Sequence, residues 1–380
     1  MGRVFYFDHA ATTAMDRRVL DEMIPYFSGE YGNASSIYSL GKSAKEAINI
    51  ARLKIASSIN CNSNEVYFTS GGTESDNLAL KGIAMAYRNF GNHIITSKIE
   101  HPAILNSCKA LENMGFRVTY LNVDSNGRIR LEELERAITR QTILISIMFA
   151  NNEIGTIQDI KAIGAIAKKY HVIFHTDTVQ AIGNCRIDVR SMNIDSLSMS
   201  GHKFYGPKGV GVLYVRNGIK FVRQNDGGHQ EQDHRSGTEN TAGIVGIGKA
   251  IELASSDLER YNHQLAMLSD YYLREVQRRI PNIKINGDPN NKLAGNNNIC
   301  FAGIDGGKLI PLLDKKGICA SSGSACSAGL INPSHVLLAT GVNPNLARGS
   351  LRITFGKENT IEDVKYLVDS LEEIITNLRK

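Results

Sequence analysis

The sequence contains no tryptophan, no long hydrophobic run and no block of consecutive basic residues. Its longest apolar stretches, such as residues 143–150, fall well short of the roughly 20 residues that a membrane-spanning helix needs, so no membrane contact is expected. The net charge of +5 is mild for 380 residues, and direct binding of nucleic acid is not expected either. Residues 1–8 have a strand pattern with no signal-peptide pattern before them, which favours a cytoplasmic location.

Cysteine is also sparse, and no two cysteines are spaced as in a CxxC motif. The six cysteines stand at positions 61, 108, 185, 300, 319 and 326. Scattered thiols indicate neither a disulfide framework nor a zinc site, so no resident metal is predicted. Most are expected to be small buried side chains, with Cys326 as the exception.

The composition is that of an ordinary globular protein, 42% hydrophobic and 21% charged. The length of 380 residues exceeds what a single hydrophobic core usually supports, so two domains are expected. Between about residues 42 and 250, helical and strand patterns alternate. Strands are predicted at 66–69, 94–96, 118–121, 143–148, 172–175, 195–199 and 210–215, and helices at 42–56, from 73 onward, and at 102–114, 131–138 and 160–169. This alternation predicts an α/β fold with a mostly parallel sheet flanked by helices.

The pattern changes after residue 250, where 251–279 forms a long, charged amphipathic stretch. Mixed strands and helices follow, and the chain ends in an amphipathic helix over 361–378. We therefore predict a large α/β domain over 15–255 and a small α+β domain formed by 1–14 and 256–380.

Polar side chains follow five of the predicted strands. Ligands of an open parallel sheet bind at the carboxyl ends of its strands. The segments that follow these strands are 70–74, 100–102, 150–153, 177–180 and 200–203. One such segment would carry little weight, but five at one edge predict a binding site.

Lys203 ends one of these segments, after Ser200 and His202. A primary amine beside small polar groups at a strand end suits covalent attachment to a carbonyl cofactor. Gly72 and Thr73 open a helix after another strand, where free N–H groups bind anions such as phosphate. Alternatives remain, since a single lysine is usually solvated and a Gly-Thr pair can be a tight turn with a helix cap.

Asp177 follows an apolar strand, where an ionised carboxylate needs a partner. A protonated pyridine nitrogen would be such a partner and would strengthen the ring as an electron sink. His101 can stack on the ring and move protons, although a single histidine is more often structural. Asn152 and Gln180 offer side-chain amides suited to a ring hydroxyl.

Cys326 lies within a run of nine small residues that includes it, SSGSACSAG, at 321–329. Such a loop cannot pack a core, and a thiol within it suits a nucleophile that moves to its target, the alternative being an inert structural cysteine. Arg352 stands within a strand pattern and suits bidentate capture of a substrate carboxylate. The alternative for Arg352 is an ordinary strand-edge ion pair.

With these residues identified, the chain closely resembles the pyridoxal-phosphate-dependent cysteine desulfurases of the NifS/IscS type, within the class V aminotransferase family. That resemblance implies the type I fold of pyridoxal-phosphate-dependent transferases and extends over nearly the whole chain. The motifs that carry it lie at 8–13 (DHAATT), 69–77, 100–103 (EHPA), 151–158, 175–180, 200–211, 235–240 (RSGTEN) and 321–326.

The resemblance implies that Lys203 holds pyridoxal phosphate covalently and removes the Cα proton of the substrate. It implies that Asp177 pairs with the pyridine nitrogen and that His101 stacks on the ring. The residues implied to contact the phosphate or the ring hydroxyl are Gly72, Thr73, Asn152, Gln180, Ser200 and His202. Thr238 is implied to reach the phosphate from the partner subunit of a homodimer.

The resemblance also implies that Arg352, with Asn152, binds the carboxylate of L-cysteine. Cys326 is implied to attack the substrate sulfur, giving L-alanine and an enzyme persulfide. A persulfide implies an acceptor, such as an iron–sulfur scaffold or a tRNA-thiolation protein, and leaves room for a transient contact of Cys326 with iron–sulfur clusters. Tyr38 and Thr178 depart from the family pattern and are expected to alter substrate handling rather than reaction type.

Three alternatives stay open: a selenocysteine lyase, another class V aminotransferase, and a non-enzymatic iron–sulfur scaffold. Transamination has no need of a mobile thiol, so Cys326 argues against it. A scaffold has no need of the acid–base groups around Lys203. Cysteine and selenocysteine cannot be distinguished by these residues.

Overall fold

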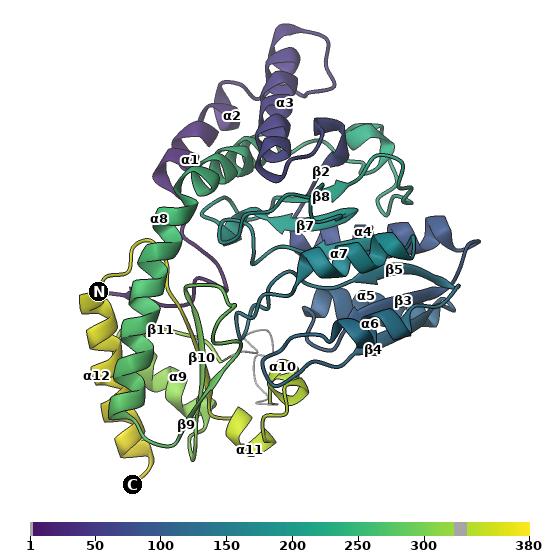
Figure 1. Cartoon of the computed structure of the whole chain (residues 1–380). Coiled ribbons are helices and arrows are strands. Elements are labelled where there is room, and N and C mark those ends of the chain that lie inside the picture. The colour runs from purple at the N-terminus through teal and green to yellow at the C-terminus, as the bar shows by residue number, and fades with distance from the viewer. Residues whose placement is uncertain (1–2, 323–332) are drawn as a thin grey trace.

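The short hydrophobic stretches of the first two thirds of the chain form one seven-stranded sheet, as the computed structural model shows (Figure 1). The structure describes residues 3–322 and 333–380. The strands of this sheet are β2 (Val66–Thr69), β3 (His93–Ser97), β4 (Arg117–Leu121), β5 (Thr142–Ser146), β6 (Ile173–Asp177), β7 (Ser196–Ser200) and β8 (Gly211–Val215).

The strands lie side by side in the order β2-β8-β7-β6-β5-β3-β4. Only β8 runs against its neighbours, so the predicted α/β fold with a mostly parallel sheet is confirmed. Every residue of β3, β5, β6 and β7 is buried, because helices cover both faces of the sheet.

Successive residues of the strands serve opposite faces. Ile94 and Leu144 pack in one core with Ile104, whereas their neighbours Ile95 and Ile145 pack in another. The helices of the first 240 residues are α1 (Arg17–Met23), α2 (Pro25–Ser28), α3 (Ser39–Ile59), α4 (Gly72–Tyr87), α5 (Pro102–Asn113), α6 (Leu131–Ala137) and α7 (Ile160–Lys169), with short 3-10 helices η1 (Ser63–Glu65), η2 (Gly201–Lys203) and η3 (Gln230–Asp233). The helices α4 and α5 cover the first face, and α6 and α7 cover the second (Figure 1).

The long helix α8 (Thr241–Arg279) joins this sheet to a second, smaller core. Its residues from Ala242 to Ile251 pack with α3, and those from Leu265 to Val276 pack with the C-terminal elements. The predicted domain boundary at residue 255 falls inside this continuous helix and stays a prediction.

The smaller core surrounds two small sheets. The elements of this part are β1 (Phe5–Tyr6), β9 (Ile283–Asn286), β10 (Asn296–Phe301), α9 (Gly306–Asp314), β11 (Ile318–Cys319), α10 (His335–Ala339), α11 (Pro344–Ala347), β12 (Ser350–Thr354) and α12 (Ile361–Leu378). The N-terminal strand β1 pairs with β11, while β10 lies between β9 and β12 in an antiparallel sheet. The strand expected over residues 1–8 is shorter, because the chain turns at Asp8, whose carbonyl accepts from the amide of Ala11.

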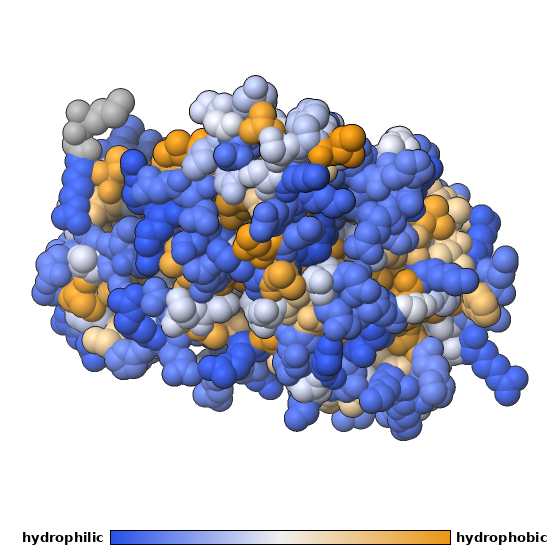
Figure 2. All heavy atoms as spheres, turned by 90° about the horizontal axis from the view of Figure 1, so that it is seen from above, coloured by the Kyte–Doolittle hydropathy of each residue, from blue (hydrophilic) through white to orange (hydrophobic). Residues whose placement is uncertain are grey.

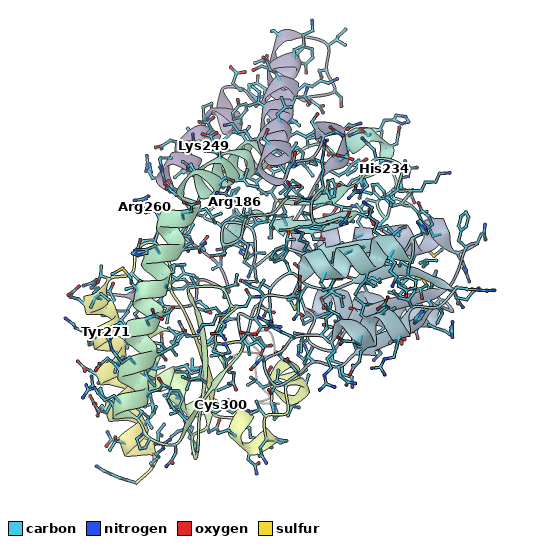
Figure 3. The ribbon with its side chains drawn as sticks, viewed as in Figure 1. Arg186, His234, Lys249, Arg260, Tyr271 and Cys300 are labelled. Atoms are coloured by element: carbon cyan, nitrogen blue, oxygen red, sulfur yellow. The ribbon has the colours of Figure 1, made fainter. Side chains whose placement is uncertain are left out.

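Within the described residues, no helix combines the length and the apolar character that crossing a bilayer demands. Five cysteines lie in this part of the chain, and none of the five forms a disulfide. Cys108 and Cys300, the latter on β10 (Figure 3), are fully buried, but Cys61, Cys185 and Cys319 are only half-buried, so the expectation that most thiols are buried is wrong for the described cysteines.

Candidate functional site

The carboxyl ends of five strands meet at one edge of the large sheet, because β2 and β7 both run antiparallel to β8 while β3, β5 and β6 follow the direction of β7. A cavity of about 670 Å³ lies at this edge. The predicted site residues that line it are Gly72, Thr73, His101, Asn152, Asp177, Gln180, Ser200, His202, Lys203 and Arg352. The structure therefore brings together side chains from both parts of the chain.

Lys203 reaches the cavity from η2, directly after β7. Its Nζ donates hydrogen bonds to the carbonyl oxygens of Ala10, at 2.6 Å, and Ala11, at 2.7 Å. The same carbonyl of Ala10 accepts from Nε2 of Gln180 at 3.0 Å. The amine is thus a partly buried group inside the cavity, and the reading as a solvated surface lysine does not hold.

The start of α4 forms a cradle for an anion. Its N-cap is Gly71, and no described side chain caps the helix, so the first N–H groups of α4 are available to a ligand where Gly72 and Thr73 line the cavity. A Cβ atom placed on Gly72 would lie 2.6 Å from Cγ2 of Val179, so the backbone here approaches the segment that follows β6 more closely than a side chain allows. These features favour the anion-binding interpretation over a Thr-capped turn.

Two polar side chains complete the cradle. Ser200 is buried beside Gly72. Nδ1 of His202 lies 3.1 Å from Oγ1 of Thr12. Burial, together with the charges of Lys203 and Lys208, lowers the pKa of His202 to about 4. This imidazole is therefore a neutral hydrogen-bonding group at pH 7.

Asp177 ends β6 at the base of the cavity and is only 6% exposed. Burial raises the pKa of its carboxyl, while His101, the amide of Val179 and Lys203 act in the opposite direction. Val179 donates its amide to Oδ1 of Asp177 at 2.9 Å. A buried carboxylate of this kind suits a ring cation held in the cavity.

His101 has a defined tautomer. Its Nδ1 accepts the amide hydrogen of Ala103 at 3.1 Å, so the ring proton of the neutral form lies on Nε2. Burial lowers the pKa of His101, which keeps the ring uncharged near neutral pH. A neutral ring at the cavity wall suits stacking on an aromatic cofactor.

Asp76 is a cavity residue to which the sequence assigned no role. Asp76 is the fifth residue of α4, is 1% exposed and lines the cavity. Burial first, and then the charge of Asp177, raise its pKa well above the ordinary value. His175, 3.8 Å away, offers no charge in return, since burial lowers its pKa to about 3. The sequence feature that could have identified Asp76 is an acidic residue on the buried face of a predicted helix.

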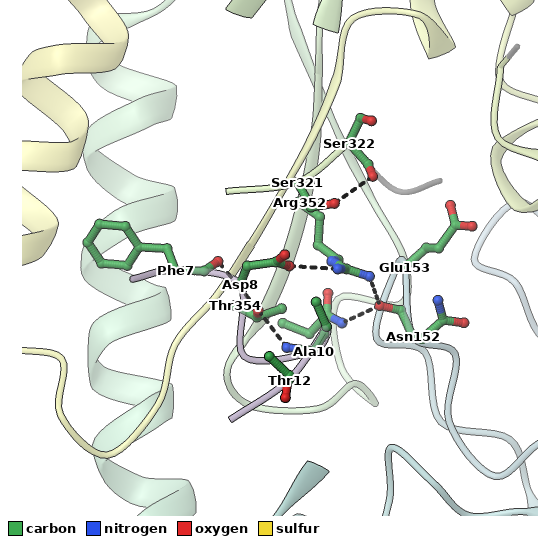
Figure 4. Close-up of polar contacts among 12 residues, drawn as sticks. Phe7, Asp8, Ala10, Thr12, Asn152, Glu153, Ser321, Ser322, Arg352 and Thr354 are labelled. Carbon is green, nitrogen blue, oxygen red and sulfur yellow. Dashed lines mark hydrogen bonds and ion pairs between the residues drawn. The ribbon is translucent and has the colours of Figure 1, made fainter. Parts of the chain in front are cut away.

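Arg352 lies on β12, is 3% exposed and borders the cavity. Its Nη2 lies 2.7 Å from Oδ1 of Asp8, and its Nη1 donates to the carbonyl of Asn152 at 3.1 Å (Figure 4). Nε has no partner among the described residues, although it is buried. Arg352 therefore forms an ion pair and still retains a donor for a further acceptor.

Two predicted residues are not placed in the cavity. Thr238 lies in a separate hollow of about 180 Å³ that Ser70 and Glu239 also line. Cys326 lies outside the described residues. The described neighbours of its segment are close to the site, because the amide of Arg352 donates to the carbonyl of Ser321 at 2.6 Å.

The two departures from the family pattern that are expected to alter substrate handling differ in position. Thr178 is fully buried beside the site, where its hydroxyl donates to the carbonyl of Ser198 at 2.7 Å. Tyr38 is 58% exposed and does not line the cavity. The described part of the chain holds no group of three or more His, Cys, Asp or Glu side chains arranged to bind a metal ion.

The cavity fits pyridoxal phosphate by its donor set. An uncapped helix start with Ser200 matches a phosphate, Asp177 matches a pyridinium nitrogen, and Lys203 matches an aldehyde carbon. The orphaned Nε of Arg352 at the other end matches a substrate carboxylate.

Comparison with known proteins agrees with this fit. The family model described as Aminotransferase class-V matches residues 5–367. The cysteine desulfurase IscS of Clostridium botulinum strain Hall is 50% identical over 382 residues, covering 100% of this chain and 96% of that protein. The cysteine desulfurase IscS of Methanosarcina thermophila is 52% identical over 377 residues, covering 99% and 93%.

Solved structures are similar as well. A NifS-like protein superposes with a TM-score of 0.93 at 38% identity, over 99% of this chain and 100% of that one. SspA in complex with cysteine gives a TM-score of 0.82 at 38% identity, over 93% and 99%. The chain belongs to the class V aminotransferase family and, within it, to the pyridoxal-phosphate-dependent cysteine desulfurases of the NifS/IscS type.

Proposed function

We propose that this protein converts L-cysteine to L-alanine and keeps the sulfur as a persulfide on Cys326. The observation that carries the proposal is the position of Arg352 in the cavity that also contains Lys203 and Asp177. One end of this cavity can bind the cofactor, and the other offers a buried guanidinium for an amino-acid carboxylate. The relatives named cysteine desulfurase, similar over their whole length, support this choice of substrate.

Pyridoxal phosphate, when bound, supplies an electron sink for negative charge at the substrate Cα. Gly72, Thr73, Ser200 and His202 would hold its phosphate, with Asn152 and Gln180 near the ring hydroxyl. Asp177 would keep a proton on the ring nitrogen.

Lys203 would bind the cofactor covalently and then remove the Cα proton, because its Nζ is the primary amine of the cavity wall. The carbonyls of Ala10 and Ala11 hold that nitrogen at a fixed position. His101, neutral and with its proton on Nε2, can donate a hydrogen bond to the substrate while it stacks on the ring.

Cys326 would perform the sulfur step. Its thiolate forms a bond to the substrate sulfur, the Cβ–Sγ bond breaks, and the electron pair stays with the carbon skeleton, which takes up protons to become alanine. Persulfide sulfur then passes to an acceptor, for which an iron–sulfur scaffold or a tRNA-thiolation protein is our proposal. Identifying the protein that takes labelled sulfur from Cys326 would test this last step.

Replacing Cys326→Ser separates cofactor chemistry from sulfur transfer. We expect the variant to keep the visible absorption of the bound cofactor and to lose sulfide release from cysteine by a hundredfold or more, on the order of the loss of a catalytic nucleophile. Lys203→Ala should lose the visible band itself.

Cys319→Ser is the matched control. Burial raises the pKa of the Cys319 thiol, so it is a poor nucleophile and its loss should leave sulfide release unchanged. Undiminished sulfide release from Cys326→Ser, assayed with a reductant, would contradict the assignment.

A homodimer in the cytoplasm is also part of the proposal. Thr238 lies outside the cavity of its own chain, so the implied phosphate contact needs a second copy. The free thiols of the described residues support a reducing compartment.

A further inference from the structure

Besides Asp8, a second buried carboxyl group, that of Glu153, lies near Arg352, and the proposed reaction assigns it no role. Glu153 lies in the loop after β5, is 3% exposed and lines the cavity together with Arg352. It directly follows Asn152, whose carbonyl accepts from Arg352 (Figure 4). A carboxyl group at this position is costly to ionise unless it has a partner of opposite charge.

The surroundings of Glu153 supply hydrogen bonds but little positive charge. Ser334, at the start of α10, donates its hydroxyl to the Glu153 carboxylate. From β10, the side-chain amide of Asn298 donates to the backbone carbonyl of Glu153 at 3.2 Å. His335 of α10 also lines the cavity, but its Nε2 is directed to the carbonyl of Glu100, 3.0 Å away.

Arg352 is the cation that acts on Glu153, and Asp8 already shares it. Oδ1 of Asp8 lies 2.7 Å from the guanidinium, and the side chain of Asp8 is only 17% exposed. One guanidinium therefore pairs with Asp8 and also acts on the carboxyl group of Glu153, which lines the same cavity, before any ligand binds. Burial raises the pKa of Glu153 to about 7, against the opposing effects of Ser334 and Arg352. Near neutral pH, Glu153 is thus divided between its two protonation states.

Because the proposed function brings a substrate carboxylate to Arg352, a third negative charge enters this cluster. Three carboxylates cannot share one buried guanidinium without a large electrostatic cost. We propose that Glu153 takes up one proton when a substrate carboxylate binds Arg352. Glu153 is then a positioning residue whose protonation sets the affinity of the carboxylate subsite.

The proposal fixes the sign of a pH effect. Where Glu153 is already protonated, binding takes up no proton and affinity does not depend on pH. Where Glu153 is ionised, each binding event takes up one proton, and affinity falls about tenfold for each further pH unit. Removing the carboxyl group should therefore improve binding at alkaline pH, the opposite of what a damaged site would show.

Calorimetry with 3-mercaptopropionate tests this on the holoenzyme. This probe has the carboxylate and thiol of cysteine but no amine, so it cannot react with the cofactor carbonyl and brings no amine protons. Titrations in Tris and in PIPES, buffers with different heats of ionisation, give the number of protons taken up. At pH 8 we expect close to one proton for the wild type and none for Glu153→Gln. At pH 8.5, about 1.5 units above the pKa of Glu153, the variant should bind the probe about thirtyfold more tightly than the wild type.

Glu100→Gln is the matched control. Glu100 is a fully buried carboxyl of the same region, with a pKa that burial raises to about 8, but its oxygens accept from Ser97 and Met148 rather than facing Arg352. This variant should keep the proton uptake of the wild type. Zero uptake by the wild type at pH 8, or unchanged uptake by Glu153→Gln, would overturn the proposal.

Failure of the proposed function gives a different result. If the wild type binds the probe with proton uptake but releases no sulfide from cysteine, the function is wrong and the linkage stands. If cysteine is turned over but the probe does not bind, Arg352 is not a carboxylate site and the inference falls.

Discussion

At the scale of single residues, the cavity is notable for carboxyl groups that compete for few cations. Asp76 and Asp177 share its inner wall, and both have pKa values that burial raises. The charge of Lys203 lowers the pKa of Asp177, whereas no cation is among the charges that act on Asp76. We therefore expect a single proton on this pair to reside on Asp76, which would leave Asp177 ionised for the proposed pairing with the ring nitrogen.

Asp76→Asn tests this division. A folded-state pKa above the unfolded value means that the native state holds a proton which the unfolded chain releases, so wild-type stability falls as pH rises from the acid range toward the raised pKa. The neutral asparagine should remove that decline, so the urea midpoint of the variant relative to the wild type should rise between pH 4 and pH 8. Cofactor content should stay at the wild-type level.

Asp177→Asn is the contrasting variant at the same wall. Its neutral side chain cannot stabilise a ring cation, and we expect turnover to fall by about a hundredfold or more, the scale of losing one preorganised charge. Equal effects of the two substitutions on turnover would contradict the assignment of the proton.

Residue roles could be predicted where the sequence places a polar side chain directly after a buried strand. Lys203 and Asp177 follow that rule, and both line the cavity. The partnership of Asp8 with Arg352 could not be predicted, because the two residues are 344 positions apart and meet only through the small sheet. Glu153 was visible at a strand end, but its charge environment depends on that same distant pair.

At the scale of elements, periodic hydrophobic patterns predicted the bounds of helices well, but they did not predict helical segments that contain several glycines. The C-terminal helix occupies the predicted residues, Ile361–Leu378. The helix α8 starts at Thr241, ten residues before the predicted amphipathic stretch. Those ten residues contain Gly243, Gly246 and Gly248, which are weak helix formers in isolation.

Packing explains why glycine is used in α8. A Cβ atom on Gly248 would lie 2.7 Å from Cβ of Ala51, so the bare backbone allows α8 to approach α3 closely. Tertiary contact therefore overrides the low helix propensity, and no local pattern could reveal it.

The same reasoning predicts the effect of Gly164→Ala in α7. Glycine to alanine in a helix normally stabilises, but here the new Cβ would overlap the carbonyl oxygen of Met192, a backbone atom that cannot move aside. We expect a loss of about 1–3 kcal/mol in the free energy of urea unfolding, the usual cost of overpacking.

Gly29→Ala is the control for that measurement. Gly29 has a φ of −86°, and its added Cβ would meet its nearest neighbour at an ordinary 3.5 Å. The free energy of unfolding of Gly29→Ala should stay within about 0.5 kcal/mol of the wild-type value. If Gly164→Ala were as stable as Gly29→Ala, the backbone around Met192 would be able to move aside at little cost, and the prediction would be wrong.

At the scale of the whole molecule, one end of the chain exposes an unusual number of large apolar side chains. These are Ile24 (48% exposed), Phe27 (64%), Tyr31 (68%), Ile37 (87%) and Tyr38 (58%). Figure 2 looks down on the end of the molecule where α1 to α3 lie, and hydrophobic side chains reach the surface there among hydrophilic ones. The beginning of α8, three residues after Thr238, packs against α1 and α3, so this apolar surface and Thr238 belong to the same end.

Contact with a second copy would cover this surface and carry Thr238 toward the neighbouring cavity. We therefore expect the wild type to be a dimer, and Ile37→Glu to weaken the dimer by about thirtyfold, the scale of a hot-spot residue. Sedimentation velocity over a concentration series measures this weakening, and the monomeric fraction should also retain less cofactor, because no second copy brings its Thr238 hydroxyl to the cavity. Phe90→Glu is the matched control, since Phe90 is 74% exposed but precedes β3 at the opposite edge of the sheet from the cavity. A wild-type monomer with full cofactor content and full turnover would rule out the shared site.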